Sequence, residues 1–163
     1  LLSVFDGLNL TDNTLIIFTS DNGGIRATSY QDPLRAGKGS YYEGGIRVPM
    51  LIKWQNQVKP GIENTPVTQM DFYPTLQALI APNTGLELDG QSILPLLFDQ
   101  ELDERDLYWH FPIYLEAYDP KEDGSRDPLF RTRPGSVIRS GDWKLHQYFE
   151  QDRWKYRRNS YHR

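Results

Sequence analysis

Apolar positions along the chain form runs that predict both strands and helices. Residues 14–19 are a continuous β-branched and aromatic run, which predicts a strand buried on both faces, as in the middle of an α/β sheet. A second apolar run covers residues 46–54, but Pro49 interrupts it and predicts an edge or late-starting strand. Residues 1–5 are typical of the last turns of a helix that ends near Gly7.

A helix is predicted to begin after Asp71, a favourable N-cap residue, with Pro74 in its first turn. Four apolar residues recur at helical spacing and predict a core-facing stripe: Phe72, Leu76, Leu79 and Ile80. Residues 92–98 predict one more short helix. The first half of the chain therefore predicts an α/β arrangement.

The second half of the chain predicts antiparallel strands. Residues 106–111 predict a strand, and residues 136–139 and 143–148 flank a turn at 140–142, which is typical of a hairpin. Residues 116–135 are rich in Pro, Asp, Arg and Gly and predict an exposed excursion. We expect a small antiparallel subdomain here, after an α/β first half.

Composition limits the classes of protein. The chain has 163 residues, enough for one domain, and its 13% of aromatic residues argues against disorder along the whole chain. No apolar run reaches the roughly 18 residues that a membrane span needs. The absence of cysteine removes disulfides, zinc–thiolate sites and a cysteine nucleophile. The net charge of -4 argues against nucleic acid as a partner.

The end of the chain differs from the rest in charge. Residues 153–163 hold five basic residues and no acid, so the other 152 residues carry 13 bases against 22 acids, a net charge of -9. Aromatic residues interleave with these bases, which would also suit single-stranded nucleic acid. We favour the simpler interpretation that residues 151–163 are a non-native or disordered basic tail.

Asp21 and Asn22 follow the first predicted strand directly, at its carboxyl end, where ligands of open α/β sheets bind. A carboxylate beside an amide oxygen suits a hard cation such as Ca²⁺ or Mg²⁺. The same residues followed by Gly23-Gly24 are also typical of an ordinary Asx turn, and spacing alone favours the turn.

Lys38 lies between Gly37 and Gly39, so its backbone can approach a ligand closely and its ammonium suits an oxyanion. The segment is not a P-loop, because the position five residues before Gly37 is Asp32 and Gly39 replaces the Ser or Thr. Spacing alone would favour a solvated loop lysine.

Other charged or titratable residues are weaker candidates. Glu43 and Arg47, four residues apart, are interpreted as structural, with Arg47 bracing Glu43 or Asp21. His110 stands among aromatic residues, where it could face a sugar or aryl group or be a buried structural histidine. His146 alternates with apolar residues on a predicted strand and is interpreted as structural.

Taken together, these segments resemble the sulfatases, in the order and at the spacing that this family uses. The match is strongest over residues 1–100, and two further segments extend it to about residue 149. The segments are DNTLIIFTSDNGG, PLRAGKGSYYEGGIRVPMLIKW, TQMDFYPTLQAL, LDGQSILPLL, RDLYWHFP and GSVIRSGDWKLHQYF. The resemblance implies a partial alkaline-phosphatase-like core at residues 1–100 and an antiparallel subdomain at 101–150.

The resemblance also implies hydrolysis of a sulfate ester, in a sulfated sugar or an aryl sulfate, with Ca²⁺ as cofactor. Asp21 and Asn22 would be metal ligands, and Lys38 would be a catalytic residue that touches the sulfate group. His110 would contact the substrate on its leaving-group side, together with the loop at 116–135. The family's location is periplasmic, secreted or lysosomal, and we expect neither a membrane nor nucleic acid as partner.

Two parts of the family's site have no match in this sequence. The chain has no Cys, and no Ser is followed two residues later by Pro, so the formylglycine motif Cys/Ser-x-Pro-x-Arg is absent. The early Asp-Asp pair that holds the same calcium is absent as well. We therefore expect a C-terminal part of a sulfatase, inactive alone, whose partner is the missing N-terminal part. The alternatives are a catalytically inactive fragment or pseudoenzyme, and a phosphate or phosphonate ester hydrolase of the same superfamily.

Overall fold

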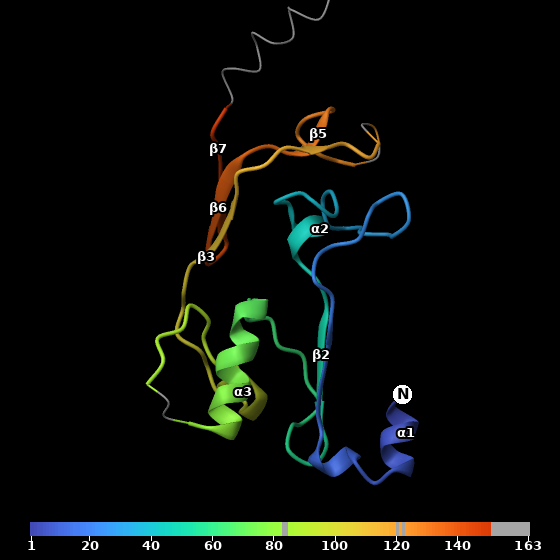
Figure 1. Cartoon of the computed structure of the whole chain (residues 1–163), viewed down its shortest axis with the longest axis vertical. Coiled ribbons are helices and arrows are strands. Elements are labelled where there is room, and N and C mark those ends of the chain that lie inside the picture. The colour runs from blue at the N-terminus through green and yellow to red at the C-terminus, as the bar shows by residue number, and fades with distance from the viewer. Residues whose placement is uncertain (83–84, 120, 122, 151–163) are drawn as a thin grey trace, which may run out of the picture. The chain divides into compact units, whose positions relative to one another are not determined.

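A computed structural model describes residues 1–82, 85–119, 121 and 123–150, and they form two compact units (Figure 1). Unit 1 comprises residues 1–19 and 50–103, and unit 2 comprises residues 20–49 with those from 104 onward. One boundary lies near the predicted domain limit at residue 100, whereas residues 20–49 group with the C-terminal strands. The predicted domains themselves stay a prediction. The predicted basic tail at 151–163 lies outside the described residues.

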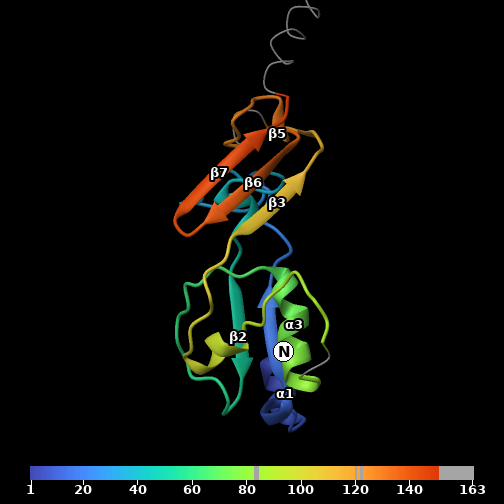
Figure 2. The same ribbon diagram turned by 90° about the vertical axis from the view of Figure 1, so that its left-hand side faces the viewer.

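Unit 1 is built on a two-stranded ribbon and short helices (Figure 2). Strands β1 (Leu15–Thr19) and β2 (Met50–Trp54) pair antiparallel, with Leu15 opposite Trp54 and Thr19 opposite Met50. β2 begins directly after Pro49, as the sequence predicts for a late-starting strand. The remaining elements of the unit are α1 (Leu2–Gly7), α3 (Phe72–Ile80) and the 3-10 turns η1 (Thr11–Asn13), η2 (Gln69–Asp71) and η3 (Leu94–Phe98).

The expectation that the first strand is buried on both faces is wrong for this structure. Phe18 and Leu51 lie opposite each other in the ribbon and are 65% and 64% exposed. Among the described residues β1 pairs only with β2, so it is not the middle strand of a sheet. An apolar run indicates which residues favour burial, but it does not supply the surface that covers them.

The predicted helix at residues 72–80 is confirmed as α3, but its cap and its buried face differ from the prediction. The Asp71 side chain does not cap α3; its carboxylate accepts hydrogen bonds from the backbone N–H groups of Thr68, at 2.7 Å, and Gln91, at 2.9 Å. Ile80 of the predicted stripe is 81% exposed, whereas the polar Thr75 is 1% exposed. The helix therefore buries a hydrogen-bonded position more completely than its apolar stripe.

Asp71 and Thr75 join two distant segments of unit 1. The Thr75 hydroxyl donates to the Asp71 carbonyl at 2.6 Å and accepts from the Ile93 N–H at 2.9 Å. Asp71, Thr75 and Ile93 are the largest fully buried side chains of the described chain. This group, here called the Asp71 hub, satisfies buried polar atoms that would otherwise destabilise the unit.

Unit 2 contains a three-stranded antiparallel sheet in the order β3-β6-β7. Its strands are β3 (Leu107–Phe111), β6 (Gly135–Ser140) and β7 (Trp143–Tyr148). Ser140 pairs with Trp143, so the predicted hairpin is confirmed. The buried hydrophobic side chains of the sheet are Val137 of β6 and Leu107 of β3, which are 2% and 7% exposed.

The predicted exposed excursion at 116–135 is partly wrong. Within it, β5 (Phe130–Thr132) pairs with β4 (Leu115–Glu116), and Asp123 and Thr132 are only 7% and 5% exposed. Its polar composition reflects side chains that bond to backbone groups, such as Asp123, which accepts from the N–H of Tyr118 at 2.7 Å. Among the helices of the described residues, none is long and apolar enough to cross a membrane.

Candidate sulfate-binding and metal site

Three backbone segments of unit 2 pack directly against one another around Lys38. The N–H of Gly23 donates to the carbonyl of Gly45 at 2.9 Å, and the N–H of Gly44 donates to the carbonyl of Arg35 at 2.8 Å. A Cβ atom on Gly44 would lie 2.1 Å from the carbonyl oxygen of Ala36. This approach is too close for any side chain, which explains the glycines of the sequence here. Gly44 and Gly45 belong to the short helix α2 (Glu43–Ile46).

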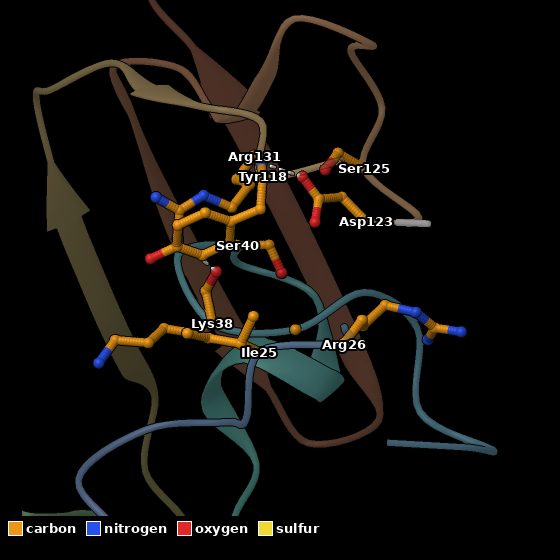
Figure 3. A pocket seen from close by; sticks show the side chains of 9 residues that line it. Ile25, Arg26, Lys38, Ser40, Tyr118, Asp123, Ser125 and Arg131 are labelled. Atoms are coloured by element: carbon orange, nitrogen blue, oxygen red, sulfur yellow. Dashed lines mark hydrogen bonds between the residues drawn. The ribbon is translucent and has the colours of Figure 1, made fainter. Parts of the chain in front are cut away.

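Lys38 is held at both ends of its own backbone. Its N–H donates to the carbonyl of Gly24 at 2.9 Å, and its carbonyl accepts from Nη1 of Arg131 at 3.1 Å. Gly39 follows with a φ of +86°, in the left-handed region that favours glycine. The Lys38 side chain is half-buried and points away from the hollow beside it (Figure 3). A flexible side chain thus starts from a fixed backbone position.

The hollow beside Lys38 is shallow and encloses no cavity, and it brings together residues far apart in the sequence (Figure 3). The lining residues with a positive charge are Arg26, Lys38 and Arg131, and the acidic lining residue is Asp123. Arg26 pairs with Asp32 at 3.5 Å. The remaining lining residues are Ile25, Gly37, Ser40, Tyr118 and Ser125. Three cationic residues and one acid thus border the hollow, and one of the cations, Arg26, has an acidic partner.

Asp21 and Asn22 follow β1 as predicted, at the start of unit 2. The side-chain amide of Asn22 donates to Oδ1 of Asp21 at 2.9 Å, and the Ser20 hydroxyl donates to the carbonyl of Asn22 at 2.9 Å. Both contacts are local and lie within residues 20–22. The carboxylate and amide oxygens fit Ca²⁺ in kind, but they are only two of the six to eight oxygen ligands that the ion takes. Among the described residues, no three His, Cys, Asp or Glu side chains gather as a metal site.

His110 lies on β3 of the same unit and is exposed. Its Nδ1 is 2.8 Å from the hydroxyl of Ser136 on β6, and its ring centroid is 5.8 Å from that of Phe149. The buried hydroxyl of Tyr41, three residues after Lys38, lies 2.9 Å from the carbonyl of Phe111 and 2.8 Å from that of Gly135. Tyr41 thus ties the Lys38 segment to the end of the strand that carries His110.

Glu43 pairs with Lys144 of β7, its Oε1 2.7 Å from the ammonium, rather than with Arg47 as predicted. Burial alone would raise the pKa of Glu43, but the hydrogen bond and charge of Lys144, with the more distant charges of Arg139 and Arg47, lower it below its usual value. Burial lowers the pKa of Lys144 even though Glu43 opposes this. The interpretation of Glu43 as structural fits this geometry.

His146 lies half-buried among tyrosines, as its predicted structural role implies. Its ring centroid lies 5.3 Å from that of Tyr42 and 6.2 Å from that of Tyr148, and its buried Nδ1 has no hydrogen-bond partner among the described residues. Burial, followed by the charges of Lys144 and Arg35, lowers the pKa of His146. Burial is also the main reason why the pKa of Tyr148 rises to about 12.

Arg131 is the residue near the candidate site that the sequence alone did not reveal. It contacts Lys38, but 93 positions separate them and Arg131 belongs to no recognisable motif. The local composition of its segment predicted only an exposed loop. Only the folding of β4 and β5 brings it to Lys38.

Comparison with known proteins identifies the family of the chain. The family model described as Sulfatase matches residues 1–81. A sulfatase of Formosa agariphila is 40% identical over an alignment 117 residues long, which covers 66% of this chain and 21% of that protein. Human arylsulfatase A is 33% identical over 151 residues, 90% of this chain and 27% of that protein. The chain thus spans about a quarter of these relatives.

A solved structure leads to the same family. It is a sulfatase from work on how Bacteroides thetaiotaomicron metabolises multiple glycosaminoglycans, and it matches with a TM-score of 0.65 at 27% identity. The match covers 90% of this chain and 30% of that one. The mixed helix-and-sheet fold of the described residues is therefore that of a sulfatase segment. The chain belongs to the sulfatase family.

Proposed function

We propose that this chain takes part in the hydrolysis of a sulfate ester and that Lys38 contacts the sulfate group. The observation that carries the proposal is the fixed backbone of Lys38, bonded to Gly24 on one side and Arg131 on the other. The family supports the reaction class, and the proposed substrate is a sulfated sugar or an aryl sulfate. The surrounding fold is proposed to be alkaline-phosphatase-like.

The chemistry of a sulfate ester explains the value of an ammonium whose side chain starts from a fixed backbone position. As the ester bond breaks, negative charge develops on the transferring group and on the leaving oxygen. A cationic donor aimed at this charge stabilises the transition state without reorganisation, and one such donor is typically worth about 3–4 kcal/mol of barrier. His110, exposed on β3, is proposed to face the leaving group.

Asp21 and Asn22 are proposed to provide two oxygen ligands of a calcium ion. A bound Ca²⁺ would stabilise negative charge on the sulfate oxygens. Two ligands do not make a tight site, so the other ligands must come from outside this sequence, and so must the formylglycine nucleophile. The proposed partner is therefore the remaining, N-terminal part of a sulfatase.

The proposal is tested with the purified 163-residue chain and a chromogenic aryl sulfate. We expect no turnover, because neither Cys nor the Ser-x-Pro-x-Arg pattern occurs in it. We also expect calorimetry to find no micromolar binding of Ca²⁺. Turnover that Lys38→Ala abolishes would contradict the expected division of the active site, and micromolar Ca²⁺ binding lost in Asp21→Ala would contradict the incomplete metal site.

A further inference from the structure

We infer that Arg131 is a positioning residue for Lys38, acting on its backbone rather than on the substrate. The inference rests on the proposed function only where it connects Lys38 to sulfate. The geometric part stands alone, because the carbonyl of Lys38 accepts a hydrogen bond from Nη1 of Arg131 at 3.1 Å. β5 carries Arg131, so the antiparallel part of unit 2 determines where the candidate sulfate contact lies.

The planar guanidinium of Arg131 bonds to two backbone segments at once. Its Nε donates to the carbonyl of Glu116 on β4 at 2.8 Å while its Nη1 donates to Lys38. A guanidinium presents these donors in a rigid fork, whereas a lysine ammonium is a single point on a flexible stem. Lysine at position 131 would therefore preserve the charge but not both bonds.

The ring of Tyr118 fixes the plane of this fork. The guanidinium carbon of Arg131 lies 3.5 Å from the ring centroid, within the range of a cation–π contact (Figure 3). The backbone of Tyr118 is held in turn, because its N–H donates to the buried carboxylate of Asp123. Arg131 is thus oriented by packing before it reaches Lys38.

Gly39 shows how closely the fork approaches. A Cβ atom at position 39 would lie 2.9 Å from Nη1 of Arg131 and 3.0 Å from a methyl carbon of Leu115. On the other side of Lys38, a Cβ atom on Gly37 would lie 2.5 Å from the carbonyl of Gly24. The two glycines beside Lys38 thus allow close neighbours on both sides of the residue, and the backbone between them is held from both sides.

The test compares the full chain with variants that separate charge from geometry. Arg131→Gln removes both, Arg131→Lys retains the charge, and Arg139→Gln is the matched control, because Arg139 bonds within its own hairpin. Two quantities are measured by NMR: the affinity for inorganic sulfate and the hydrogen-exchange rate of the Lys38 amide. The amide of Val137 in the central strand β6 reports on the stability of the sheet.

We expect Arg131→Gln and Arg131→Lys to weaken sulfate binding about five- to tenfold, the effect of about one hydrogen bond. We expect both to speed exchange at Lys38 while exchange at Val137 stays unchanged. Arg139→Gln should alter neither quantity. In Tyr118→Phe the ring remains and exchange at Lys38 should be as in the wild type, whereas Tyr118→Leu should speed it.

Three results would overturn the inference: equal effects of Arg131→Gln and Arg139→Gln, wild-type behaviour of Arg131→Lys, or equal acceleration of exchange at Lys38 and Val137. The first two would mean that Arg131 acts only through its charge, and the third that it supports the whole sheet. A wild-type chain that binds no sulfate contradicts the proposed function. Faster exchange at Lys38 in Arg131→Gln and Arg131→Lys alone would then still support the positioning role.

Discussion

Each of the two units of the chain is stabilised internally, and the interactions differ between them. Of the five buried hydrophobic residues of the described chain, only Ile93 lies in unit 1; the other four, Ala36, Tyr41, Leu107 and Val137, lie in unit 2. Unit 1 relies on the hydrogen bonds of the Asp71 hub and leaves Phe18 and Leu51 exposed. Unit 2 relies on close backbone packing and on side chains that bond to distant carbonyls.

This difference shows which unit leaves apolar surface exposed and which unit holds the candidate site residues. The exposed apolar face of the β1–β2 ribbon is typical of a surface that another segment covers. The candidate site residues Asp21, Asn22, Lys38 and His110 all belong to unit 2. The residues that we propose to contact substrate therefore lie in the unit with the more complete interior.

The largest expected effect is on the Asp71 hub. Asp71→Ala should lower the free energy of unfolding by about 3 kcal/mol, because it removes a fully buried carboxylate and leaves the half-buried N–H groups of Thr68 and Gln91 without that acceptor. Asp71→Asn retains one acceptor oxygen and should cost less. Urea denaturation measures both against Asp89→Ala, an exposed acid of the same unit. A loss in Asp71→Ala no larger than in Asp89→Ala would contradict the role of the hub.

A smaller effect is expected in unit 2, from Gly44→Ala. The new Cβ would lie 2.1 Å from the carbonyl oxygen of Ala36, so the backbone segments around Lys38 must move apart, at a cost of about 1–3 kcal/mol. Gly61→Ala is the control, since a Cβ there meets no atom within 4 Å, and it should change stability by less than about 0.5 kcal/mol. Equal stability of the two variants in urea denaturation would contradict close backbone packing.

The smallest effect concerns pH. Because the folded chain lowers the pKa of His146, the unfolded chain binds the proton more readily, and stability falls as pH drops below about 6.5 toward the lower pKa of the folded state. The slope is at most one proton, about 1.4 kcal/mol per pH unit. The contribution of Glu43, whose pKa is lowered, is lost only below about pH 4.5.

The pH dependence is measured as the free energy of unfolding between pH 8 and 5. His146→Gln should flatten the slope in this window. A slope that survives in His146→Gln would show that another group titrates there.

The sequence predicted elements whose signals are local. The apolar run before Asp21 is strand β1, and the turn at 140–142 joins β6 and β7, because periodicity and turn chemistry act over a few residues. It did not predict that Phe18 is exposed, since a pattern does not show which surface covers a residue. The bond from Arg131 to Lys38 depends on a long loop folding back, which local composition does not reveal.

For the candidate site, the sequence and the resemblance predicted Lys38, Asp21 and Asn22. The glycines around Lys38 indicated that its backbone can approach a ligand closely. The structure adds the physical reason for those glycines, which is the contact of the segment with its neighbours on both sides. The assignment of Lys38 to sulfate and of Asp21 and Asn22 to calcium stays a prediction.

The most direct test of the central claim is the chemical modification of Lys38 in the presence of sulfate. The full chain is reductively methylated in sodium sulfate or in sodium chloride of equal ionic strength, and mass spectrometry measures the extent at each lysine. The account predicts that sulfate slows modification of Lys38 but not of Lys53 or Lys59. Lys53 lies in strand β2 and Lys59 is an exposed lysine paired with Asp99, so neither belongs to the candidate sulfate site. Equal protection of all three lysines, or none at Lys38, would contradict it.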